Sequence, residues 1–247
     1  SQESTIQYCI IKNAEIGINV VDFGGNQFPV INNNIITHCG YGIKSDDGSN
    51  FDILSNIIIN NTTGIFVYRS DPLINNNIIS ENNTAISVSA GTCGGGNLCG
   101  GVSSTISNNS INNNFNSTIS ISNSAPSIIN NTITGNIGII ININKFSPSI
   151  TNNNFILNES PYLIAGVDDI SATNNWWGTT SESAIDSLIY DINDDFDLGQ
   201  VDYDPYLTTP DTDAPISPPT NVVKVASGSN VVLTWTANSE SDVAGYK

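Results

Sequence analysis

The residues best suited to chemistry form a small charged cluster in the first third of the chain. Asp46 and Asp47 are adjacent, and Arg69, the only arginine, and Asp71 follow about one structural repeat later. Two nearby carboxylates, such as Asp46 or Asp47 with Asp71, can supply the acid and the base that cleave a glycosidic bond. The alternative is an exposed ion pair between neighbouring turns, worth at most about 1 kcal/mol. The sequence favours the ion pair, because nothing in it shows that the carboxylates face one cleft.

A second group of oxygen-bearing side chains lies towards the other end of the sequence. They fall at positions 1, 3, 5, 7 and 12 of one run, which is the spacing of an EF-hand calcium loop. The residues are Asp191, Asn193, Asp195, Asp197 and Asp202. Phe196 stands at the sixth position, where such a loop requires glycine. A solvated acidic turn is therefore the preferred interpretation, and calcium is the one cofactor that the sequence leaves open.

The cysteines indicate the compartment of the protein. Cys93 and Cys99 flank a glycine-rich loop, and a local disulfide between them fits a secreted chain. A metal pair is the alternative, but neither a histidine nor a second cysteine pair lies nearby in sequence. Cys9 and Cys39 fall in adjacent repeats at different positions, so we expect two buried free thiols rather than a bridge.

The composition disfavours several classes of partner. Charged residues make up 12% of the 247 residues, and the net charge is -17. Only 6 residues are lysine or arginine, so the chain lacks the clustered cations that nucleic-acid phosphates or an anionic membrane surface require. No stretch has the roughly 18 continuous apolar residues of a transmembrane helix. Polysaccharides and other extracellular proteins remain as partners.

A repeated sequence unit predicts the fold that must position these residues. Several segments share the order apolar, any residue, Asn, Asn, any residue, apolar, as in Ile128 to Ile133. The second asparagine of the unit is expected to form a stacked ladder of Asn33, Asn56, Asn76, Asn109, Asn131, Asn153 and Asn175. Asparagine tolerates the left-handed backbone of a tight turn, and amides in stacked turns can bond to one another. The last four of these positions recur every 22 residues.

A short alternating strand follows each asparagine turn. Its expected inward pairs are Ile43/Ser45, Ile65/Val67, Ile86/Val88, Ile119/Ile121, Ile141/Ile143 and Leu163/Ala165. Alternation over such short runs indicates half-buried strands rather than helices. A unit of about 22 residues built from short strands is typical of a solenoid. The sequence therefore predicts an all-β parallel β-helix of about eight coils over residues 1–207.

The end of the solenoid and the segments beyond it have their own signals. We expect one of Trp176 and Trp177 to plug the open hydrophobic end, since solenoids need caps. Serine and threonine before Glu182, followed by spaced apolar residues, predict a short capping helix. Residues 208–219 are rich in Pro, Asp and Thr and are expected to form a linker. Residues 220–247 resemble the opening strands of a fibronectin type III domain, incomplete at this length.

The long segment from Ser4 to Leu207 resembles the right-handed β-helix repeat proteins, a family shared by polysaccharide lyases, glycosidases and many surface proteins. The Asn-Asn-Trp-Trp-Gly-Thr end at 174–179, with Val201-Asp202-Tyr203-Asp204-Pro205, is similar to the C-terminal end of bacterial extracellular members. The resemblance implies a right-handed coil and an extracellular or cell-surface location. It is specific for the fold and not for an activity.

Two functions are consistent with these observations. The first is a non-catalytic extracellular structural or carbohydrate-facing module of a larger secreted or cell-surface protein. The alternative is a polysaccharide lyase or glycoside hydrolase that acts on an exposed β-helix face. Enzymes that cleave uronates usually need several cations to hold the polyanion, and this acidic chain would repel one. The sequence therefore favours the module, with further domains of the same chain as expected neighbours.

Overall fold

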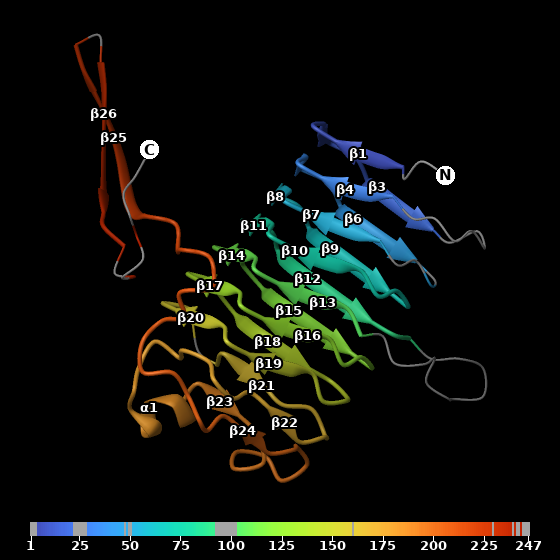
Figure 1. The fold of residues 1–247 in the computed structure, drawn as a ribbon, viewed down its shortest axis with the longest axis vertical. Coiled ribbons are helices and arrows are strands. Elements are labelled where there is room, and N and C mark those ends of the chain that lie inside the picture. The colour runs from blue at the N-terminus through green and yellow to red at the C-terminus, as the bar shows by residue number, and fades with distance from the viewer. Residues whose placement is uncertain are drawn as a thin grey trace.

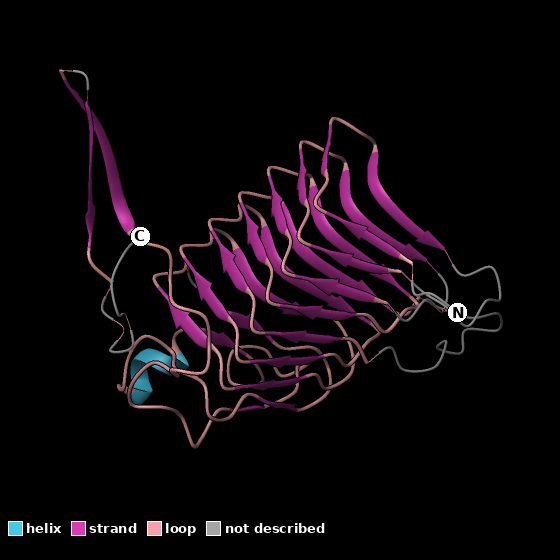
Figure 2. Cartoon of the chain, turned by 45° about the horizontal axis from the view of Figure 1, so that its top comes forward, coloured by secondary structure: helices cyan, strands magenta, loops and turns pink. Residues whose placement is uncertain are grey.

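The chain winds into a three-sided stack of parallel strands (Figures 1 and 2). The computed structural model describes residues 4–21, 29–46, 48, 51–91, 103–159, 161–228, 230–238, 240 and 243. In each coil two three-residue strands and one longer strand follow one another, separated by short turns. The predicted right-handed parallel β-helix with a period of about 22 residues is confirmed.

Three parallel sheets form the sides of the solenoid. Sheet A consists of β1 (Thr5–Gln7), β4 (Val30–Asn32), β7 (Asp52–Leu54), β10 (Leu73–Asn75), β13 (Thr105–Ser107), β16 (Ser127–Ile129), β19 (Ser149–Thr151), β22 (Ile170–Ser171) and β24 (Val201–Asp202). Sheet B consists of β2 (Ile10–Lys12), β5 (Ile35–Thr37), β8 (Ile57–Ile59), β11 (Ile78–Ser80), β14 (Ser110–Asn112), β17 (Thr132–Thr134) and β20 (Asn154–Ile156). Sheet C consists of β3 (Ile16–Val21), β6 (Tyr41–Asp46), β9 (Thr63–Tyr68), β12 (Thr84–Ser89), β15 (Ser117–Ser122), β18 (Ile139–Ile143), β21 (Leu163–Ile164) and β23 (Ile189–Tyr190).

The solenoid has about seven complete turns rather than the eight expected. Sheet B ends at β20, and the next coil contributes to it only one isolated bridge, between Asn154 and Trp176. The tryptophans that close the stack therefore replace a full strand on that side.

The core is a column of stacked isoleucines. Each three-residue strand of sheets A and B points its middle residue inward. The six-residue strands of sheet C point two residues inward, and all six pairs predicted for this sheet are buried. In the second coil Ile31, Ile36 and Ile43, one from each sheet, have no exposed surface. Burying an isoleucine side chain contributes roughly 1.5–3 kcal/mol, so the repeated isoleucines are the main source of stability.

A ladder of buried asparagines runs along the turn between sheets A and B. Asn56 shows the pattern: its Oδ1 accepts hydrogen bonds from the backbone N–H and the Nδ2 of Asn34, both at 3.0 Å. Its Nδ2 donates to the carbonyl of Ile31 at 2.8 Å and to Oδ1 of Asn77 at 3.1 Å. The ladder comprises Asn34, Asn56, Asn77, Asn109, Asn131, Asn153 and Asn175.

The predicted ladder is correct in five coils and wrong in two. Asn33 and Asn76 are exposed and left-handed, with φ of 53° and 57°, while the next residue in each case enters the ladder. The ladder residue lies three positions after the inward isoleucine, whereas the prediction counted from the partly exposed Val30 and Leu73. Two adjacent residues thus have separate roles: the first adopts the left-handed turn, and the second contributes the stacked amide.

A second asparagine ladder, which the sequence analysis missed, runs between sheets B and C. It comprises Asn61, Asn82, Asn114, Asn136 and Asn158, joined by the same amide bonds. The backbone N–H of Cys39 donates to Oδ1 of Asn61 at 2.9 Å, so this cysteine stands at the N-terminal end of the second ladder. Two of the three corners of the solenoid are therefore held by stacked amides.

The C-terminal end is closed by aromatic residues and a short helix. Trp177 is 1% exposed and stacks on Phe155 with ring centroids 4.9 Å apart, so it is the plug that the sequence predicted. The helix α1 (Glu182–Asp186) places Ile185 in the core. Ser181 is its N-cap, but no side-chain cap bond forms. Among the described residues no helix is long and apolar enough to cross a membrane.

The segment expected to be a linker lies against the solenoid. We call residues 207–217 the strap; Asp211 exchanges two hydrogen bonds with the side chain of Asn154, at 2.9 and 2.7 Å. The strap leads to β25 (Thr220–Ser227) and β26 (Asn230–Thr236), which pair as an antiparallel hairpin. Every described residue of both strands is exposed, including Trp235. Two strands do not define a fibronectin type III domain, so that identification stays a prediction.

Candidate functional site

The outer face of sheet C carries a cluster of aromatic and charged side chains on β6 and β9. These strands point Ile43, Ser45, Ile65 and Val67 into the core, so the intervening residues face outward. The outward set, which we call the aromatic face, is Tyr41, Lys44, Asp46, Phe66 and Tyr68. Lys44 stands opposite Phe66 in the parallel register. The parallel pairing of β6 with β9 thus fixes the spacing of all five side chains.

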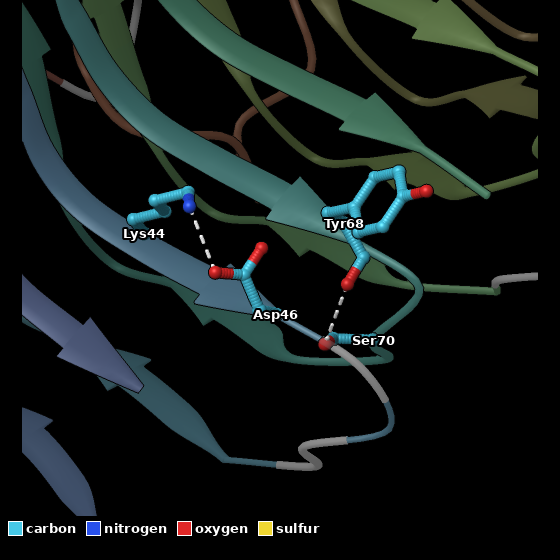
Figure 3. A network of polar contacts seen from close by, with 4 residues as sticks. All are labelled: Lys44, Asp46, Tyr68 and Ser70. Atoms are coloured by element: carbon cyan, nitrogen blue, oxygen red, sulfur yellow. Dashed lines mark hydrogen bonds and ion pairs between the residues drawn. The ribbon is translucent and has the colours of Figure 1, made fainter. Parts of the chain in front are cut away.

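An ion pair forms the polar part of the aromatic face. Lys44 Nζ lies 2.8 Å from Asp46 Oδ2, and about a quarter of each side chain is exposed (Figure 3). Both residues belong to β6 and lie two positions apart, so the pair follows from strand alternation. The turn after β9 is tightened by Ser70, whose hydroxyl donates to the carbonyl of Tyr68 at 3.0 Å.

Three rings form the apolar part. Tyr41 and Phe66 meet edge to face with centroids 5.4 Å apart. Phe66 and Tyr68 are nearly parallel, with centroids 6.4 Å apart and planes inclined by 7°. Arg69 places its guanidinium carbon 5.1 Å from the Tyr68 centroid, a cation–π contact. All three rings are partly exposed. The result is a continuous strip of rings with a cation at one end.

The predicted catalytic cluster is only partly assembled by the structure. Asp46 pairs with Lys44, and Arg69 lies over Tyr68. Asp71 accepts a hydrogen bond from the backbone N–H of Ser103, in the following coil. Asp47 lies outside the described residues. Each described carboxylate is therefore engaged by a different partner, and no described contact joins Asp46 to Asp71.

Sequence reasoning named Asp46 and Arg69 here but missed Tyr41, Lys44 and Phe66. The available signal was the alternation itself. Once Ile43 and Ile65 are assigned to the core, the residues beside them must face outward, and two neighbouring strands then show aromatics on one surface.

Two of the residues proposed for calcium, Asp191 and Asp195, accept local hydrogen bonds. Asp191 is buried; its Oδ1 accepts from the N–H of Asn193 at 2.9 Å and its Oδ2 from the N–H of Val201 at 2.9 Å. Asp195 accepts from the N–H of Asp197 at 3.1 Å. Within the described part of the chain, no three acidic, cysteine or histidine residues form a group that could hold a metal ion.

A pocket of about 450 Å³ lies beside this turn, at the capped end of the solenoid. Its wall includes Asp186 and Tyr203, and the Tyr203 hydroxyl donates to Asp186 Oδ1 at 2.6 Å. That hydrogen bond, together with burial and the nearby negative charges, raises the pKa of Tyr203. The bond fastens the segment after β24 to the capping helix.

The cysteines divide into two cases. Cys93 and Cys99 lie outside the described residues, so their predicted disulfide stays a prediction. Cys9 and Cys39 are both free; Cys39 is buried as expected, but Cys9 is exposed. The difference arises because Cys9 belongs to the first described coil, which no other described coil covers on its outer side.

The fold and the ladders define a right-handed parallel β-helix protein. The sequence model of a family described as "Right handed beta helix region" matches residues 1–98. No curated protein and no solved structure matches the chain. The match and the solenoid together support a parallel β-helix family, while the bacterial and fibronectin type III resemblances stay predictions.

Proposed function

We propose that this chain is a non-catalytic, carbohydrate-facing module of a larger secreted or cell-surface protein. The observation that carries the proposal is the strip of Tyr41, Phe66 and Tyr68 beside the Lys44–Asp46 ion pair, on the outer face of sheet C. A β-helix fits a structural or carbohydrate-related module in general.

The chemistry of the aromatic face suits a sugar chain. Aromatic rings offer apolar contact at little entropic cost, and the Tyr hydroxyls add polar contacts. The C–H faces of pyranose rings are apolar, whereas their hydroxyls need donors and acceptors at the edge. Lys44 and Asp46 supply one of each and are already held in place by their mutual bond. A rigid surface of this kind loses little entropy on binding.

The charge of the chain favours a neutral polysaccharide. A net charge of -17 repels uronate polymers at a distance. The rings bind through apolar contact and do not depend on ligand charge. The preferred ligand class is therefore an uncharged glycan of several sugar units.

The way the described carboxylates are used supports a role without cleavage. A glycosidase needs two carboxyl groups across one scissile bond. Asp46 forms an ion pair with Lys44, and Asp71 accepts a hydrogen bond from a backbone N–H of the next coil. Asp47 is the residue on which the alternative, a lyase or hydrolase, depends.

Affinity electrophoresis in gels that contain neutral or acidic polysaccharides tests the proposal. We expect a neutral glycan to retard the wild type, and Phe66→Ala to weaken retardation about tenfold or more. Ile164→Ala is the matched control, because Ile164 is a partly exposed apolar residue in the same outward row of sheet C, four coils away. Equal retardation of both variants, or retention by no polysaccharide, would refute the carbohydrate-facing role.

A further inference from the structure

One outward row of sheet B changes character along the solenoid. The first residue of each sheet B strand faces outward, and the parallel register stacks these residues in one line. From the N-terminal to the C-terminal coil they are Ile10, Ile35, Ile57, Ile78, Ser110, Thr132 and Asn154. The first four are isoleucines, and the rest are polar.

The polar end of the row is covered by the strap. Asn154 exchanges two hydrogen bonds with the backbone of Asp211, and the hydroxyl of Thr132 donates to the carbonyl of Pro215. Both side chains are consequently buried. Residue 211 contacts the seventh coil and residue 215 contacts the sixth. The strap therefore runs along this row towards the isoleucines.

The apolar end of the row lies open. The four isoleucines are 37% to 69% exposed, although they form one continuous line. Successive coils are about 4.8 Å apart, so the line extends over about 14 Å. Contiguous exposed apolar surface on a rigid face marks a contact site.

The hairpin of β25 and β26 also exposes apolar side chains. It stands clear of the solenoid and points towards the end where β1 lies (Figure 1). One of its faces carries Val223, Val225 and Val232, which are 46% to 52% exposed. A two-stranded hairpin alone is marginally stable in water, so this face needs apolar surface to pack against.

The dimensions of the two surfaces agree. The base of the hairpin, at Thr220 and Thr236, already lines a small pocket with Thr134 on β17. The eight residues of β25 extend about 26 Å at about 3.3 Å each. From β17 to β2 is five coils, or about 24 Å at the coil spacing. A hairpin that turned about its base would reach the whole isoleucine row.

We propose that the hairpin folds down onto sheet B, with Val223, Val225 and Val232 against Ile35, Ile57 and Ile78. The strap and the hairpin then form one continuous cover along the row, polar over the sixth and seventh coils and apolar above them. The opposite hairpin face carries Leu233 and Trp235.

Hydrogen exchange of the full chain tests this docking. Amides of residues 220–236 should exchange slowly in the wild type, because docking must be lost before the hairpin opens. Ile78→Asp should accelerate their exchange at least tenfold, and Val225→Asp should do the same from the hairpin side. Ile137→Asp is the matched control, since Ile137 is 45% exposed against 46% for Ile78 and lies outside sheet B; it should leave the hairpin unchanged.

Two results would overturn the proposal. One is equally fast exchange of the hairpin amides in the wild type and in Ile78→Asp. The other is a wild type that is dimeric by light scattering and becomes monomeric in Ile78→Asp, which would place a second copy on the isoleucine row. Protection of the sheet A amides, unchanged in every variant, shows that the solenoid itself has remained folded.

Discussion

Replacing one ladder asparagine with alanine should destabilise the solenoid strongly. Asn131 lies in the middle of the first ladder and is fully buried. Its Oδ1 accepts from the backbone N–H and the Nδ2 of Asn109, at 2.9 and 3.0 Å. Its Nδ2 donates to the carbonyl of Ile106 at 2.8 Å and to that of Ile129 at 3.0 Å.

The magnitude follows from the groups that Asn131→Ala leaves behind. The Asn109 N–H and the Ile106 carbonyl both lose the side chain as a partner in a dry turn. An orphaned buried polar group costs about 1–3 kcal/mol, so we expect a loss of about 3–5 kcal/mol in the free energy of unfolding. Asn144→Ala, at an exposed site, should change it by less than about 0.5 kcal/mol.

Urea denaturation followed by far-ultraviolet circular dichroism measures both variants. The midpoint should fall clearly for Asn131→Ala and stay near the wild-type value for Asn144→Ala, at a similar slope. If Asn131→Ala costs less than about 1 kcal/mol, the ladder is dispensable and the isoleucine column alone holds the coils.

Three further substitutions probe the capped end, the contact between coils and the carboxylate of Glu240. Trp177→Ala should cost about 3–5 kcal/mol by emptying the capped end, and Trp176→Ala, at a half-buried site, should cost less; thermal melts compare them, and an equal loss would contradict the plug. Gly64→Ala should lower the melting temperature, because its Cβ would lie 2.6 Å from the carbonyl oxygen of Ala85 in the next coil; an unchanged melt would show that the coils can separate there. Burial raises the pKa of Glu240, but hydrogen bonds from Ser217 outweigh it, so the pKa lies below its ordinary 4.5. The charged carboxylate therefore stabilises the fold above pH 4.5, and this stabilisation is lost as the pH falls through the folded pKa. In parallel denaturation curves below about pH 4.5, the wild type should lose more stability than Glu240→Gln. An equal loss in both proteins would contradict this role of Glu240.

The fold could be predicted from the sequence because each repeat contains two independent signals of it. Inward isoleucines give the strand period, and buried asparagines give the turn. The error at Asn33 and Asn76 arose where three asparagines stand in a row, since composition alone does not show which one points inward. The neighbouring isoleucine does, as Ile31 and Asn34 demonstrate.

The candidate site was less predictable. Charged residues such as Asp46 and Arg69 are rare in this chain and were found directly. Phe66 gave no signal by itself, because an aromatic residue in a strand is equally suited to the core. Only the register between β6 and β9 shows that the ring faces outward beside Tyr41. The strap was also missed, since its contacts with Asn154 join residues 57 positions apart.

If the aromatic face binds a glycan without cleaving it, the bound glycan must be recovered intact. The most direct measurement is the chain length of a retained neutral oligosaccharide, determined by mass spectrometry after long incubation with the protein and elution. We expect retention that depends on Phe66 and an oligosaccharide of unchanged length. Shortened products that disappear in Asp47→Ala would contradict it and establish a lyase or hydrolase on the same face.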